Sequence, residues 1–349
     1  MMIETLLARM TLEQKAGQVM AFGFDGVALN LPAQEMIERL HPGGVVLFAQ
    51  NVIAPDQLAQ LTGDLQRAAK SSGDPVLIIS IDQEGGRVAR LRRDKGFSEF
   101  PSAQSVGSAG DPKGAARQVA YAIAHELKAA GINTDLAPVL DVNINPHNPV
   151  IDDRSFGAIP ALVSACGVAF IQELQAQGVM AVGKHFPGHG DTTADSHVAL
   201  PVVAHDRARL EQVEFAPFRA AIAAGVGGIM SSHIWFPAIE STPNLAATLS
   251  SQVMTGLLRD EMKFSGIRMT DSLEMGALQT SGYPVPLAAV TALKAGADML
   301  FFNCGHTLNY GAHAALVEGV GRGEIPMARL DEAISRILLA KERFGILSS

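Results

Sequence analysis

VMAVGKHFPGHGDTTADSHVALP, residues 179–201, is the stretch of sequence that decides the fold. Its small apolar residues from Val179 to Gly183 predict a short buried strand. Two glycines and a proline then fall within the four residues 187–190, where neither a strand nor a helix continues. Three histidines, two aspartates and a lysine lie between residues 184 and 197. A buried strand that feeds such a loop is typical of an active site on a rigid scaffold.

The same alternation of strand and helix runs along the rest of the chain. Eight strand-like apolar runs are predicted, at residues 19–24, 45–48, 76–81, 132–139, 179–183, 226–230, 266–270 and 299–302. The helix-like segments between and after them are 32–41, 55–70, 114–130, 161–177, 210–224, 250–262, 286–295, 314–320 and 327–344. Alternating elements imply a parallel sheet, and eight strands predict a closed (β/α)8 TIM-like barrel. A doubly wound open sheet is the alternative, which is disfavoured because no strand leads into a GxGxxG turn.

Composition places the chain among compact enzyme-like proteins. Of its 349 residues, 48% are hydrophobic and 18% charged, which suits one large α/β domain. The net charge of −8 without a run of Lys or Arg argues against nucleic acid and anionic membranes as partners. Glu4 stands where a signal peptide needs basic residues, and no apolar run reaches the roughly 20 residues that span a bilayer. We therefore expect a soluble cytoplasmic monomer, with Cys166 and Cys304 as buried thiols in a reducing compartment.

Polar side chains recur where the predicted strands end. They are Asp82, Glu84, Asp135, Asp141, Lys184, His185, Ser231, Ser232, His233, Asp271, Ser272 and Asn303. In a barrel the C-terminal ends of all strands share one face, where the loops build the active site. The loops after the third, fourth and fifth strands extend to about residues 110, 159 and 203, and loops of this length usually carry function. The sequence therefore predicts a functional site on this face.

Four motifs carry a resemblance to a known family. They are KHFPGHGDTTADSH (184–197), DQEGGRV (82–88), RSFG (154–157) and MTDSL (269–273). Together they resemble the β-N-acetylglucosaminidases of glycoside hydrolase family 3, and the resemblance covers essentially the whole chain. The second domain of some members has no counterpart here. The resemblance therefore implies that residues 1–349 form a single catalytic barrel domain with long loops after the third, fourth and fifth strands.

The resemblance also implies a role for each matching residue. Asp271 corresponds to the nucleophile that attacks the anomeric carbon, and His197 to the general acid/base that Asp195 assists. The positions that match the sugar-binding residues of the family are Asp82, Arg90, Arg154, Lys184 and His185. The implied reaction releases terminal β-linked GlcNAc from muropeptides during peptidoglycan recycling, with retention through a covalent glycosyl–aspartate intermediate. No metal or other cofactor is implied.

The chemistry of the residues themselves bears on the catalytic roles. Retaining glycosidases normally use two carboxylates about 5–5.5 Å apart, and Asp271 at the end of an apolar strand suits the nucleophile. A cap of the following helix is its alternative role. Asp195 and His197 lie two residues apart, so both point to one side of an extended segment, where the carboxylate fixes the histidine tautomer. A solvated histidine beside a capping aspartate is equally compatible with this spacing.

The candidate binding residues are weighed in the same way. A buried Lys184 requires a partner, since unpaired charge in a core is costly, and a carboxylate with a sugar hydroxyl would satisfy it. For Arg90 and Arg154 the residues alone favour surface ion pairs. His189 and Asp191 are interpreted as loop-shaping residues outside the site. His233, at a strand end, is a weaker candidate for the pocket lining.

Three rival functions remain open at this point. A metal-dependent barrel hydrolase would use the ligands His185, His189, Asp191, Asp195 and His197. Against it, no His-x-His pair ends the first strand and Lys184 would stand beside the cation. A sugar-binding or regulatory barrel would have the same fold but no catalytic activity. A phosphorylase would use the same site with phosphate in place of water. A histidine base repels phosphate less than a glutamate would.

Overall fold

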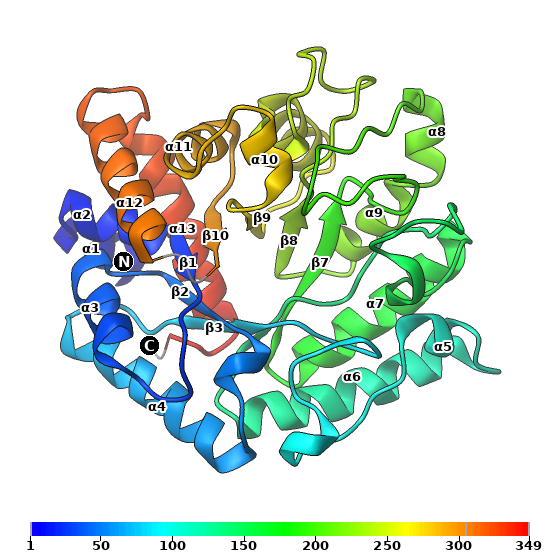
Figure 1. Cartoon of the computed structure of the whole chain (residues 1–349), viewed down its shortest axis with the longest axis horizontal. Helices are drawn as coiled ribbons and strands as arrows, with labels where there is room; N and C mark the ends of the chain where they lie inside the picture. Colours follow the sequence, from blue (N-terminus) through cyan, green and yellow to red (C-terminus); the bar gives the residue numbers. More distant parts are fainter. Residues whose placement is uncertain (1, 304–305, 348–349) are drawn as a thin grey trace.

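The computed structural model describes residues 2–303 and 306–347 and confirms the predicted barrel. Within these residues eight parallel strands form the barrel: β1 (Met20–Phe22), β2 (Gly44–Leu47), β3 (Ile78–Ile81), β6 (Thr134–Asp135), β7 (Met180–Phe186), β8 (Gly228–Ser231), β9 (Ile267–Ser272) and β10 (Met299–Phe302). The barrel is closed because β1 pairs with both β2 and β10. Figure 1 shows the strands at the centre of a ring of helices.

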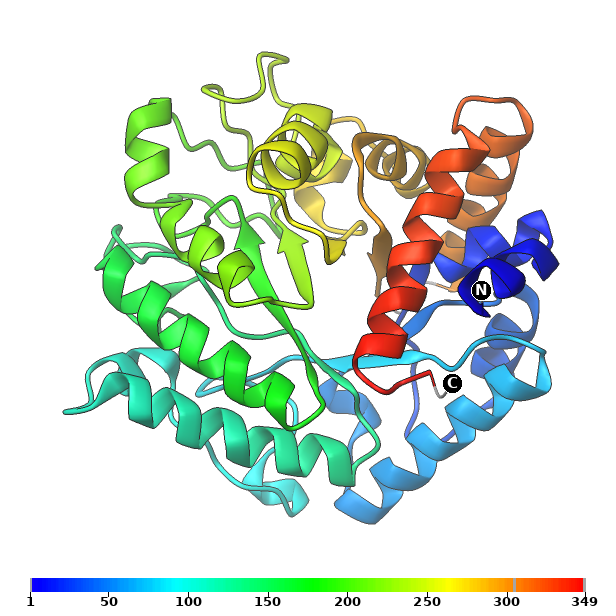
Figure 2. The ribbon, with the colours of Figure 1, turned by 180° about the vertical axis from the view of Figure 1, so that it is seen from behind.

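Helices cover the outside of the barrel. They are α1 (Met2–Arg9), α2 (Leu12–Gln18), α3 (Leu31–Leu40), α4 (Pro55–Ser71), α6 (Pro112–Ala129), α7 (Pro160–Ala176), α8 (Arg207–Gln212), α9 (Ala216–Ala223), α11 (Val285–Ala295), α12 (His306–Gly321) and α13 (Met327–Arg343). In α4, Leu58, Leu61 and Leu65 recur at helical spacing and are buried on one face. Figure 2 shows α13, in red, beside the N-terminal helices that it contacts.

Three predicted helices differ from the observed ones, one of them in length only, since α12 begins at residue 306 and not near residue 314. The segment 210–224 was expected to be one helix, but it forms α8 and α9. The break falls where Pro217 takes the first turn of α9, because proline lacks the N–H that a continuous helix would need there. The segment 250–262 contains a π-helix, η5 (Gln252–Glu261), instead of an α-helix.

Two strands differ most from their predicted limits. The fifth predicted strand was expected to end at Gly183, but β7 continues to Phe186, so Lys184 and His185 lie within a strand and not at the start of a loop. The fourth, predicted over 132–139, is reduced to β6, after which only Val139 bridges to Lys184. Pro138 supplies no N–H to the ladder there.

The long connection after β3 has structure of its own. It contains the antiparallel hairpin β4 (Gln83–Gly85) and β5 (Val88–Ala89) and the short helices η2 (Arg93–Lys95) and α5 (Ala103–Gly107). Gly85 and Gly86 turn the hairpin with positive φ. A Cβ on Gly85 would also lie 2.4 Å from the Pro101 carbonyl oxygen. This loop is therefore an ordered wall beside the C-terminal ends of the strands.

Buried charges at the opposite end of the barrel are paired with one another. Arg268 near the start of β9 is 2% exposed, and its Nη2 lies 3.1 Å from Oδ1 of the fully buried Asp298, which precedes β10. Arg329 of α13 contacts the same oxygen at 2.8 Å. Charged groups at this end of a barrel serve stability, since the loops that build sites lie at the other end.

Two smaller expectations concern the cysteines and the membrane. Cys166 is buried in α7 and its thiol is free; Cys304 lies outside the described residues. Among the described helices, none has both the length and the apolar composition needed to cross a bilayer.

Lys341 in α13 is a buried cation without a hydrogen-bonding partner among the described residues. Burial lowers the pKa of Lys341 from 10.5 to about 7, and the negative charge of Asp74 opposes this only in part. The unfolded chain thus keeps the proton between about pH 7 and 10.5 while the folded chain loses it. Stability must rise with pH through this window, and the full cost of burying the charge applies below it.

We predict that Lys341→Met raises the free energy of unfolding more at pH 6 than at pH 10. The difference between the two effects should be about 3–5 kcal/mol. The thioether side chain has a similar length and carries no charge to desolvate. Urea denaturation of both proteins at the two pH values measures the difference. Lys70→Met, at an exposed position of α4, is the control and should leave the pH dependence of the wild type unchanged. Parallel pH profiles for wild type and Lys341→Met would contradict the prediction.

Candidate functional site

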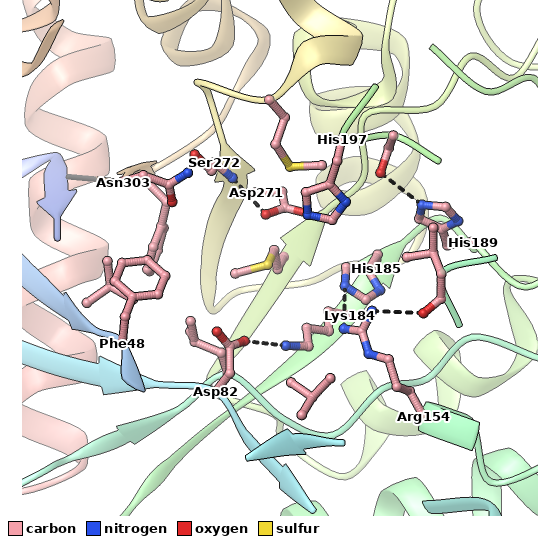
Figure 3. Close-up of a pocket in the computed structure, with 18 of the residues that line it drawn as sticks. Phe48, Asp82, Arg154, Lys184, His185, His189, His197, Asp271, Ser272 and Asn303 are labelled. Atoms are coloured by element: carbon pink, nitrogen blue, oxygen red, sulfur yellow. Dashed lines mark hydrogen bonds and ion pairs between the residues drawn. The ribbon is translucent and has the colours of Figure 1, made fainter. Parts of the chain in front are cut away.

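A pocket opens at the C-terminal ends of the barrel strands, where the sequence predicted a site. The predicted residues that line it are Asp82, Arg90, Arg154, Lys184, His185, His197 and Asp271. They come from β7, from β9 and from the loops after β3, β6 and β7, and Figure 3 shows most of them around one space. Asp195 does not line the pocket but is hydrogen-bonded to His197, which does.

Lys184 is the centre of a buried charge network. It is 2% exposed, and its Nζ lies 2.7 Å from Oδ1 of Asp82 and 2.7 Å from Oε1 of Glu84. Burial alone would lower the pKa of Lys184, but the two carboxylates outweigh burial and raise it. The lysine therefore stays charged, and the predicted carboxylate partner is present twice.

The two carboxylates extend the network to the arginines. Asp82 accepts a hydrogen bond from Arg90 Nη2 at 3.0 Å, and Glu84 is held by the Nε and Nη2 of Arg154 at 2.8 and 2.7 Å. Burial opposes ionisation of both acids, but Lys184 and the arginines lower the pKa of Glu84 to about 2 and that of Asp82 further below its usual range. Both arginines thus form ion pairs that face the pocket, not the surface pairs that the residues alone favoured.

His185 is oriented by a buried acid. Its Nδ1 lies 2.7 Å from Oδ2 of Asp141, and Asp141 also accepts the backbone N–H of His185 and of His189. Burial works against the charge of Asp141, but the neighbouring histidines and these hydrogen bonds lower its pKa. An ionised Asp141 accepts the Nδ1 proton, so the other nitrogen of His185, 3.4 Å from Arg154 Nη2, points toward the pocket.

Asp271 stands near the end of β9 at the pocket wall. Its Oδ1 accepts the backbone N–H of Ser272 at 2.7 Å. Burial would raise the pKa of Asp271, but His233, His185, the Ser272 N–H and Lys184 lower it in sum. The carboxylate is therefore ionised and surrounded by positive or hydrogen-bond-donating groups, as a nucleophile requires.

His233 supports β9 from behind and does not line the pocket, contrary to the weaker expectation from its strand-end position. It is 1% exposed, with Nε2 2.8 Å from the Ser272 carbonyl oxygen and Nδ1 2.9 Å from Thr248 Oγ1. Burial lowers its pKa although the Asp271 charge opposes this. Since a carbonyl only accepts, Nε2 carries the proton.

Asp195 and His197 are paired, which is one of the two arrangements that their spacing left open. His197 Nδ1 lies 2.8 Å from Asp195 Oδ1, which also accepts the His197 backbone N–H. Partial burial disfavours the Asp195 charge, but the bonds from His197 outweigh it and lower its pKa. The two side chains are 65% and 40% exposed for His197 and Asp195 respectively. The pair therefore lies at the open side of the pocket. Asp195 engages Nδ1 of His197 and not Nε2.

His189 and Asp191 shape the loop as interpreted from the sequence, but His189 also lines the pocket, although it was expected to lie outside the site. His189 borders the pocket, but its Nδ1 bonds Thr192 Oγ1 at 2.8 Å and its Nε2 bonds Ser196 Oγ at 3.1 Å. Burial lowers the pKa of His189 to about 4, so the ring is neutral at physiological pH. Asp191 pairs instead with His205.

Two functional residues were missed by the sequence reasoning as members of the site. Glu84 joins Lys184 to Arg154, and Asp141 orients His185. The signal for both was their position just beyond predicted strands, in the DQEGG motif and after the fourth strand. A third strand-end acid, Asp135, is buried away from the lining; burial raises its pKa well above the usual value, and Oδ1 accepts the Gln83 N–H.

The ligands of the metal-dependent alternative do not converge. In the part of the chain that the structure describes, no group of three His, Cys, Asp or Glu side chains is arranged to hold a metal ion. His185 and Asp195 are engaged with Asp141 and His197, while both nitrogens of His189 contact hydroxyl groups. The donor set therefore does not fit a cation at this place.

Similar proteins are known for most of the chain. The "Beta-hexosaminidase A" of Pseudoalteromonas piscicida is 42% identical over 76% of this chain and 46% of its own length, so the chain spans under half of that relative. The "Beta-hexosaminidase" of Nitrosomonas eutropha is 38% identical over 79% of this chain and 78% of its own. A solved "glycoside hydrolase family 3 beta-N-acetylglucosaminidase" from Paenibacillus sp. str. FPU-7 superposes with a TM-score of 0.94, at 44% identity over 97% of this chain and 63% of that one.

The family model "Glycosyl hydrolase family 3 N terminal domain" matches residues 11–340. This match spans every strand of the barrel and every residue placed in the pocket above. The chain belongs to glycosyl hydrolase family 3.

Proposed function

We propose that this chain is a retaining exo-β-N-acetylglucosaminidase that removes terminal β-linked GlcNAc from muropeptides. The observation that carries the proposal is that an ionised Asp271 and His197, which is hydrogen-bonded to Asp195, line one pocket. The names of the two β-hexosaminidases and of the β-N-acetylglucosaminidase structure support the sugar. We further propose that residues 1–349 act as one catalytic domain, in the cytoplasm and as a monomer.

Sugar binding falls to the buried network in this proposal. Asp82 accepts hydrogen bonds from sugar hydroxyls, while Lys184 donates to them with the one N–H that its contacts to Asp82 and Glu84 leave free. Arg90 and Arg154 supply donors for further hydroxyls or for the acetamido carbonyl, while Nε2 of His185, whose Nδ1 proton is directed at Asp141, can accept from a hydroxyl. Because this network is charged and mutually bonded, it holds its geometry before the sugar arrives.

The reaction has two steps. In the first, an Asp271 oxygen attacks the anomeric carbon, the bond to the aglycone oxygen breaks, and His197 Nε2 gives that oxygen its proton. In the second, water attacks the anomeric carbon, His197 takes up a water proton, and the bond to Asp271 breaks. Asp195 stabilises the charged imidazolium and fixes the tautomer that presents Nε2.

A covalent trap tests the nucleophile. We predict that a fluorinated GlcNAc analogue with an activated leaving group labels Asp271. Fluorine slows both steps, but the activated leaving group restores the rate of the first, so the covalent intermediate accumulates. Peptide mapping by mass spectrometry should find the adduct on the peptide that contains residue 271, and Asp271→Asn should remain unlabelled. A label on another residue would refute the assignment.

Leaving-group dependence tests the acid. We predict that His197→Ala lowers kcat/KM by about 10²–10⁴-fold for disaccharide substrates, which need protonation of the departing oxygen. Dinitrophenyl glycosides need none and should lose far less. Val198→Ala, at a neighbouring exposed side chain, is the matched control and should behave as the wild type on both substrates. Equal losses on both substrates in His197→Ala would count against the acid role.

Product analysis separates hydrolysis from phosphorolysis. We expect GlcNAc-containing muropeptides to yield free GlcNAc at the same rate with and without inorganic phosphate. Chromatography with mass detection distinguishes GlcNAc from GlcNAc 1-phosphate. Phosphate-dependent release of the phosphorylated sugar would replace the hydrolase by the phosphorylase. Absence of any turnover would favour the non-catalytic barrel.

A further inference from the structure

The loop that carries His197 is joined directly to the segment that follows the Asp271 strand. The backbone N–H of Gly276 donates to the His197 carbonyl oxygen at 3.1 Å, and that of Ala277 donates to the Ser196 carbonyl at 3.1 Å. These donors begin the short helix α10 (Gly276–Thr280), four residues beyond β9. Two backbone hydrogen bonds therefore connect the two halves of the site.

Gly276 makes this approach possible. A Cβ built on it would lie 2.5 Å from the His197 carbonyl oxygen and 2.9 Å from that of Val198, both closer than real contacts allow. The obstructing atoms belong to backbone and not to a flexible side chain, so the loop itself would have to move. Gly276 does not have a positive φ, so the glycine is required by the close approach alone.

Ser196 holds the same loop from the other side. Its side chain is 3% exposed and its Oγ lies 3.1 Å from His189 Nε2. Thr192 bonds the other ring nitrogen and Asn148 donates to the His189 carbonyl at 2.7 Å, so the histidine is fixed within the loop. A neutral His189 can accept the Ser196 hydroxyl proton at Nε2.

The side chain of His197 has little else to define its position. At 65% exposed it is not packed, and its partner Asp195 belongs to the same loop and moves with it. The imidazole is therefore placed by the backbone at residues 196 and 197, which contacts Gly276 and Ala277 above and His189 through Ser196.

We propose that Gly276 is a positioning residue for His197, acting through the close contact that docks the acid/base loop against the start of α10. The inference rests on the proposed acid role of His197. It adds that the distance between the acid and the nucleophile depends on the absence of a Cβ at residue 276. Docked, the loop presents Nε2 to the leaving oxygen; undocked, Asp271 keeps its environment but lacks its acid.

Gly276→Ala tests the proposal. We expect kcat/KM on a GlcNAc disaccharide to fall about 10- to 100-fold, since displacement of a catalytic group by about 1 Å has such an effect. On the dinitrophenyl glycoside the loss should stay within about threefold, because no acid is needed there. Gly321→Ala, where an added Cβ meets no atom within 4 Å, is the matched control and should retain wild-type values on both substrates.

A double-mutant cycle with His197→Ala separates positioning from general damage. Once His197 is removed, Gly276→Ala should change disaccharide turnover by less than about twofold, because there is no acid left to displace. A loss of the same size in both backgrounds would overturn the inference and assign the effect to Asp271 or to folding. The proposed function fails separately, if His197→Ala alone shows no dependence on the leaving group.

Ser196→Ala provides a second variant without a steric clash. It removes the Oγ–Nε2 hydrogen bond, and we expect about a three- to tenfold loss on the disaccharide. Little change is expected on the dinitrophenyl glycoside. Thermal midpoints of all variants control for unfolding. Unchanged disaccharide turnover in Ser196→Ala, together with an unchanged Gly276→Ala, would refute the docking of the loop as a determinant of activity.

Discussion

The ion pairs of Lys184 are the interaction on which the site depends. A lysine that is 2% exposed cannot remain charged in a barrel interior without compensating groups, and Asp82 and Glu84 both stand 2.7 Å from it. The same two acids fix Arg90 and Arg154, so one buried cation orders the loop after β3, the strand β7 and the 3-10 turn of residues 152–154. Removing any partner would leave an uncompensated charge, so the network is held together as a unit.

The site thus has a rigid half and an exposed half. The Lys184 network and Asp271 lie on or beside barrel strands, and the network is bonded on several sides. The His197–Asp195 pair lies on a loop at the open side and is largely exposed. On the proposed mechanism this division is physically sensible, because the sugar needs a preformed grip while the acid must allow the aglycone to enter and leave.

Much of this arrangement was predictable from local sequence. Apolar runs alternating with amphipathic segments predicted the barrel, and the polar residues after those runs predicted the face that carries the pocket. Six of those polar residues line it, namely Asp82, Lys184, His185, Asp271, Ser272 and Asn303, while Arg90, Arg154 and His197 were predicted through the family resemblance. The partners of the lining residues were not predictable, because they are distant in sequence. Glu84 and Arg154 are 70 residues apart, and Asp141 and His185 are 44 residues apart. The proline and glycines that follow closely predict the end of a strand at Gly183. The strand instead continues to Phe186, since pairing with β8 extends to Ser231.

A histidine in the proposed role of second catalytic group is compatible with the charge at Asp271. A second carboxylate beside Asp271 would raise the pKa of one of the two acids, since like charges at short range cannot both ionise. An imidazolium has the opposite effect and favours the ionised nucleophile. Asp271 already depends on nearby histidines and Lys184 to stay ionised against the cost of burial. In the proposed first step, His197 therefore supplies the proton and, until it gives that proton up, supports the charge of the group that attacks.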